Sequence, residues 1–133
     1  MNKQEARNYQ HLMNALDSLG FAFDEAQALV KIERTLHRWS ERECGDDHGC
    51  IERDEVTNKP IWRSSHTDRT WSIPDREKGA LKRLDAIMAR HPKLSYYYQT
   101  DPRGCALYIL RPGDVPEGSR AECCYSNGIA VCY

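Results

Sequence analysis

The order of its helical and strand patterns constrains the fold of this chain more than any other feature. Three segments with apolar residues at three- and four-residue steps come first, and strand-like pairs joined by turn residues follow from Leu94 onward. Helices grouped before strands favour an α+β fold over alternating βαβ units. We therefore expect three amphipathic helices packed on a C-terminal antiparallel sheet of about four strands.

The first two helices are predicted from apolar stripes and end signals. One covers residues 3–19 and is followed by Gly20, which suits a left-handed C-terminal cap. The second ends near Cys44. Its start has Asp24 and Gln27 at the spacing of a capping box, in which side chains satisfy free backbone N–H groups of the first turn. The two helices should form a helical hairpin.

A small hairpin insertion and a third helix are predicted in the middle of the chain. Residues 50–55 and 61–64 read as two short strands around a polar turn. Residues 64–70 are polar and predict an exposed loop. The third helix begins at Pro74, because proline is favoured at the first helical position, and Pro92 stops it.

Two hairpins are predicted at the C-terminal end. Residues 94–110 form the first, and residues 120–133 form the second around Asn127-Gly128. Asn-Gly between β-prone runs is the strongest short-range hairpin signal. We find no internal repeat or linker, so residues 1–133 are expected to form a single domain.

The near balance of charge narrows the classes of partner. The chain has 19 Lys and Arg against 20 Asp and Glu, whereas a binder of duplex DNA usually carries a basic excess. No apolar run approaches the ~18 residues that cross a bilayer, and the N-terminus lacks the apolar core of a signal peptide. We therefore expect a cytoplasmic protein with reduced cysteines and no membrane partner.

The cysteines leave an enzymatic alternative open. Cys44, His48 and Cys50 supply soft ligands in one short segment, and Cys123-Cys124 could complete a zinc site. Their C-x3-H-x-C spacing departs from the paired C-x2-C pattern that structural zinc sites use. A loop with buried or half-buried thiols explains these residues more simply. We therefore expect no metal and no cofactor, and we favour a binding protein over an enzyme.

The tyrosine run at residues 96–98 indicates a binding surface. Neighbouring aromatic side chains on a sheet can stack on bases or nucleotides, and arginines near a hairpin tip can hold a phosphate. Small inhibitors also bind through a few Tyr, Trp and Arg anchors. The candidate anchors are Tyr97, Arg103, Tyr108 and Arg111, with Trp62 and Trp71 behind them.

Three segments resemble a family of small proteins of phages and bacterial mobile elements. They are residues 35–45, residues 74–84 and the run Asp-Pro-Arg-Gly-Cys-Ala-Leu-Tyr-Ile-Leu at 101–110. Together they span most of the chain after Thr35. The family signature is not a chemical motif, so the resemblance implies no activity and no site residue. It implies only a setting, the cytosol of a bacterial host.

In that setting we expect a phage-encoded accessory protein that acts by non-catalytic binding. It would serve counter-defence, either as an inhibitor of a bacterial immune complex such as CRISPR-Cas or as a sponge for a signalling nucleotide. Alternatives are a small zinc-containing or cysteine-dependent enzyme and a nucleic-acid-binding regulator that uses the basic residues of the third helix. Exposed edge strands near the C-terminus would also allow a homodimer.

Overall fold

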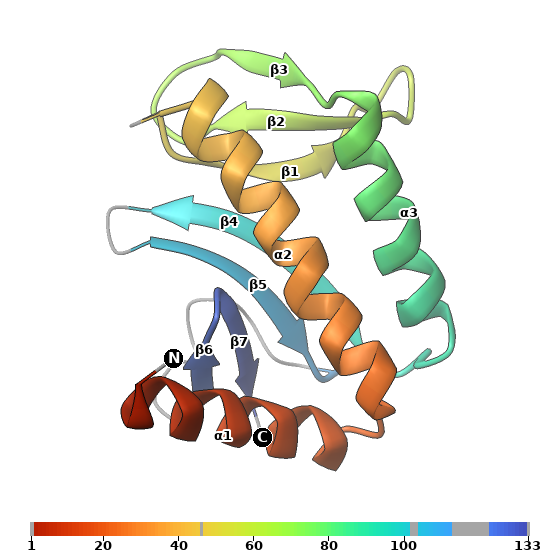
Figure 1. Cartoon of the computed structure of the whole chain (residues 1–133). Helices are drawn as coiled ribbons and strands as arrows, with labels where there is room; N and C mark the ends of the chain where they lie inside the picture. The colour runs from red at the N-terminus through yellow and green to blue at the C-terminus, as the bar shows by residue number, and fades with distance from the viewer. Residues whose placement is uncertain (1, 46, 102–103, 113–122, 133) are drawn as a thin grey trace.

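The protein has an α+β fold, shown in Figure 1. The computed structural model describes residues 2–45, 47–101, 104–112 and 123–132. Its helices are α1 (Lys3–Ser18), α2 (Phe23–Glu43) and α3 (Asp75–Ala89), and α2 crosses the sheet on the same face as α3 (Figure 1). The strands are β1 (Gly49–Arg53), β2 (Pro60–Ser64), β3 (Thr70–Ser72), β4 (Ser95–Asp101), β5 (Gly104–Leu110), β6 (Cys123–Ser126) and β7 (Ile129–Cys132).

The strands of the described residues form one mixed sheet with the order β3-β2-β1-β4-β5-β7-β6. The prediction of a purely C-terminal antiparallel sheet of about four strands was wrong in two respects. The middle hairpin joins the sheet where Cys50 pairs with Gln99, and β5 and β7 run parallel. The predicted exposed loop at 64–70 is confirmed for residues 65–69, but the short edge strand β3 that follows it was not predicted. Pairings between distant segments leave no signal in local periodicity, which explains these errors.

The predicted helix ends are close to the observed ones, with one correction at the start of α2. Gly20 has φ +99°, as expected of a left-handed cap. The cap at the start of α2 lies elsewhere than predicted. The Glu25 carboxylate accepts a hydrogen bond of 2.9 Å from the backbone N–H of Ala22. Asp24 and Gln27 do not form the predicted capping box, because the helix starts earlier in the chain than that box requires.

The C-terminal hairpin turns at the predicted residues. Asn127 and Gly128 have φ of 53° and 76°, the left-handed pair that a tight hairpin turn between twisted strands requires. The turn brings β6 and β7 together in antiparallel register, with Ser126 opposite Ile129. The sequence signal was sufficient here because the turn type is set by two adjacent residues.

The main core lies between the helices and one face of the sheet. All three helices contribute to it, and α1 packs against β6 and β7 at the lower end of the sheet in Figure 1. Leu107 and Ile109 of β5 point into this core, whereas Tyr108 and Leu110 belong to a smaller cluster with Ala130 and Tyr97. Successive side chains of β5 thus point to opposite faces of the sheet, and both faces of this strand are apolar.

No helix among the described residues is both long and apolar enough to span a bilayer.

Candidate binding pocket

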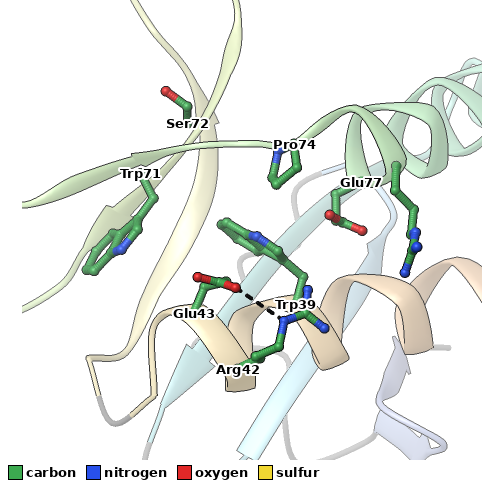
Figure 2. A pocket seen from close by; sticks show the side chains of 8 residues that line it. Trp39, Arg42, Glu43, Trp71, Ser72, Pro74 and Glu77 are labelled. Atoms are coloured by element: carbon green, nitrogen blue, oxygen red, sulfur yellow. Dashed lines mark hydrogen bonds and ion pairs between the residues drawn. The ribbon is translucent and has the colours of Figure 1, made fainter.

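One hollow of the described residues lies where the C-terminal end of α2 meets β3 and the start of α3 (Figure 2). Its volume is about 430 Å³, within the usual range for small-ligand sites. Two short stretches of chain supply the walls, residues 39–43 and residues 71–77. The buried Ile73 fixes the link between β3 and α3, and Pro74 is the extended N-cap residue of α3. The chain therefore passes directly from an edge strand into a helix around the hollow.

Two tryptophans form the aromatic part of the pocket. Trp39 is buried and meets Trp62 of the core edge-on, with ring centroids 6.0 Å apart. Trp71 is half-buried on the edge strand, and the guanidinium carbon of Arg69 lies 4.6 Å from the centroid of its ring. Figure 2 shows Trp71 reaching in from the β3 side and Trp39 rising from α2. The pocket thus has a fixed indole, held by the core, and a more exposed one.

Four charged residues surround these indoles. Arg42 and Glu43 form an exposed ion pair of 3.2 Å at the end of α2 (Figure 2). Arg76 is exposed at the start of α3, whereas Glu77 is only 3% exposed. No hydrogen bond or ion pair joins the Glu77 carboxylate to another residue of the described chain, and its oxygens are not among the fully buried side-chain atoms that lack a partner. The deepest charge of the pocket is therefore an acidic one.

The predicted anchors do not converge on a single site. Trp71 lines the pocket, but Trp62 is fully buried and belongs to the interior. Tyr97 and Tyr108 are register partners on the face of the sheet that carries the smaller apolar cluster. Tyr97 is half-buried, and Tyr108 is only 7% exposed. Tyr108 therefore offers little surface for stacking.

Arg111, one of the two predicted arginines, lies apart from the aromatic pocket. Arg111 lines a second hollow of about 460 Å³, together with Leu19, Leu94 and Pro112. Arg103 lies outside the described residues. The phosphate-holding pair that the sequence suggested is therefore not assembled in the described part of the chain.

The cysteine-centred alternative finds no assembled site among the described residues. No group of three His, Cys, Asp or Glu side chains there is placed to hold a metal ion. Burial raises the pKa of the Cys44 thiol to about 11, and burial also raises the pKa of Cys50. Both thiols are therefore protonated at neutral pH, the less nucleophilic form. The side chains of Cys123 and Cys124 lie outside the described part.

A second buried carboxylate lies at the other end of the sheet. Glu33 of α2 is 4% exposed, and its Oε1 atom is 3.6 Å from Nδ1 of His37. Its carboxylate lies against Gly128, where an added Cβ would come within 2.2 Å of it. Burial is the main cause that raises the pKa of Glu33 to about 7. Neither of the two hollows described above includes this carboxylate.

Sequence reasoning found only one of the pocket residues used here, Trp71. Trp39 is a buried residue of α2, and Glu77 is an acidic residue in the first turn of α3. No local pattern indicates that the two side chains also face a common hollow, because it forms between segments far apart in the sequence.

Compared with protein-family models, curated proteins and solved structures, the chain shows no significant match to any of them.

Proposed function

We propose that this protein acts by non-catalytic binding, and that the pocket between Trp39 and Trp71 receives an anchor side chain of a partner protein. The pocket itself carries the proposal. It combines a partly exposed indole, an indole held rigid by the core, and a volume that suits one large side chain. Binding energy at protein interfaces concentrates in such aromatic pockets.

The resemblance to phage and mobile-element proteins supplies the setting of the proposal. The partner would be a host protein complex in the bacterial cytosol, and binding would serve counter-defence by occluding an immune complex such as CRISPR-Cas. Two observations favour a protein partner over a signalling nucleotide. Tyr108 is buried and cannot stack freely on a base, and the buried Glu77 carboxylate would repel a phosphate from the pocket.

Affinity capture from a bacterial host lysate, followed by binding measurements with the purified partner, tests the proposal. Trp71→Ala should weaken the affinity for the captured partner by at least about tenfold, because an indole in an anchor pocket contributes roughly 2 kcal/mol or more. Phe23→Ala is the matched control, since Phe23 is an aromatic residue that is 66% exposed and does not line the pocket.

Equal affinities of wild-type protein, Trp71→Ala and Phe23→Ala for the purified partner would remove the pocket from the proposed interface. A captured small molecule in place of a protein would support the nucleotide-sponge alternative.

A further inference from the structure

We propose that the side chain received by the pocket is an arginine of the partner, held between the indoles and the buried carboxylate of Glu77. This inference rests on the proposed function for the source of the side chain. The choice of an arginine depends on the residues of the pocket alone. A guanidinium is planar and weakly hydrated, so it stacks on aromatic faces better than an ammonium does.

The pocket already displays this chemistry within the chain. The Arg69 guanidinium lies over the Trp71 ring at 4.6 Å, and Arg69 Nη1 is 3.8 Å from Oδ2 of Asp47. An arginine is thus held here by an indole and a carboxylate together. Arg69 does not line the hollow. The hollow itself offers a second indole, Trp39, and a second carboxylate, Glu77, to a guanidinium from outside.

The Glu77 carboxylate supplies the acidic partner for such a cation. The residue is only 3% exposed, and no described residue donates a hydrogen bond to its carboxylate. Its oxygens are not among the fully buried atoms that lack a partner, so they keep some contact with solvent beside the hollow. A carboxylate with so little contact with water is poorly solvated when it is ionised. A cation that enters the hollow would offset this penalty, and a guanidinium would also supply the missing donors.

The arginines around the pocket do not remove its preference for a cation. The Arg42 side chain is 60% exposed and is paired with Glu43, and Arg76 is exposed. Exposed charges are screened by water and salt, whereas a buried charge acts in a medium of lower dielectric constant. The positive end of α3 is offset in its first turn by Asp75 and Glu77. The deepest part of the pocket should therefore prefer a cation.

A titration of the full-length protein with single residues that carry blocked termini tests this choice of ligand. The probes are the blocked forms of arginine, lysine and aspartate, and the readout is the NMR signal of each of the three indole N–H groups, assigned with Trp→Phe variants. We expect blocked arginine to shift the Trp71 and Trp39 signals with a dissociation constant in the millimolar range. Blocked lysine should bind more weakly and blocked aspartate not at all.

Charge variants show whether the pocket prefers a cation or an anion. Glu77→Gln should weaken arginine binding by about tenfold, since it removes a charge-assisted hydrogen bond. Arg76→Gln should strengthen it by about two- to threefold, because it removes a screened like charge. Glu55→Gln is the matched control, as Glu55 is an exposed carboxylate outside the pocket, and it should leave the dissociation constant unchanged.

The outcomes separate this inference from the proposed function. Binding of blocked aspartate at the same indole signals, strengthened in Glu77→Gln, would overturn the arginine assignment while leaving the pocket as a binding site. No shift with any probe would also overturn it, and partner binding that still depends on Trp71 would then keep the proposed function. If Glu77→Gln does not fold, Arg76→Gln and the ranking of the three probes still show whether the pocket prefers a cation.

Discussion

Trp62 and Trp71 face each other across the β2–β3 pair and point to the same side of the sheet, yet they have different surroundings. Trp62 lies on an inner strand, fully buried between Trp39 and Tyr98, with ring centroids 6.0 and 6.2 Å away. Trp71 lies on the edge strand, where its ring is half-buried and borders a hollow. The two tryptophans share residue type and side-chain direction, so their positions on an inner strand and on an edge strand account for the difference in burial.

Two glutamates repeat the same contrast. Glu33 and Glu77 are almost equally buried, at 4% and 3% exposure. The backbone of Gly128 closes over Glu33, and His37 lies beside it. Glu77 instead borders the pocket. The two carboxylates therefore have different environments despite equal burial: Glu33 has an oxygen that is fully buried without a donor, whereas Glu77 borders a hollow.

The largest expected effect comes from truncation of the inner tryptophan. Trp62→Ala should lower the free energy of unfolding by about 3–5 kcal/mol, because it leaves a large cavity in the core. Trp71→Ala should lower it by about 1 kcal/mol or less, since only a half-buried contact and one cation–π contact are lost. Urea unfolding of both variants measures the difference. Equal losses would show that the edge tryptophan is as structural as its partner.

The next effect concerns the confined carboxylate. The pKa of Glu33 is raised from 4.5 to about 7, so the fold favours the protonated form. The contribution of Glu33 to stability should be largest below about pH 4.5 and fall as the pH rises through 7, by up to roughly 3 kcal/mol at 1.36 kcal/mol per pKa unit. Glu33→Gln should remove this fall and be more stable than the wild type above pH 7.

Urea unfolding between pH 4 and pH 8 measures this dependence. Glu41→Gln is the control for His37, because Glu41 Oε2 lies 2.9 Å from the other ring nitrogen and its side chain is 74% exposed. This variant should retain the fall in stability. A pH profile that is the same in wild type and Glu33→Gln would assign the titration to another group.

The smallest loss of stability is expected for two Gly→Ala variants, which distinguish close packing from backbone strain. Gly128→Ala and Gly45→Ala both place a side chain at a positive φ, +76° and +55°. Only at Gly128 would the new Cβ meet another group, the Glu33 carboxylate. We expect a loss of about 1 kcal/mol for Gly45→Ala, from strain alone, and of about 2 kcal/mol for Gly128→Ala.

The excess loss at Gly128 should shrink in a Glu33→Ala background, as a double-mutant cycle by urea unfolding would measure. An equal loss at the two glycines would mean that Glu33 moves aside without penalty, and that the confined carboxylate is less confined than its burial indicates.

Local sequence signals predicted the elements of this fold better than their arrangement. Apolar stripes located the three helices, and Asn127-Gly128 located the last turn. The pairing of Cys50 with Gln99 and the parallel pair β5–β7 were not predictable in this way, because they join segments separated by long stretches of chain. Trp71 was among the predicted anchors, but so was Trp62, and alternation along a strand cannot tell an inner strand from an edge.

The positions of the helices, the hairpin turns and the side chains that share a face can be predicted from local sequence, since these properties depend on neighbours within a few residues. The hollow between α2, β3 and α3, with Glu77 beside two indoles, arises from packing and is visible only in the folded chain. A pocket is the space that packed elements do not fill, so its position depends on contacts between segments that are distant in the chain.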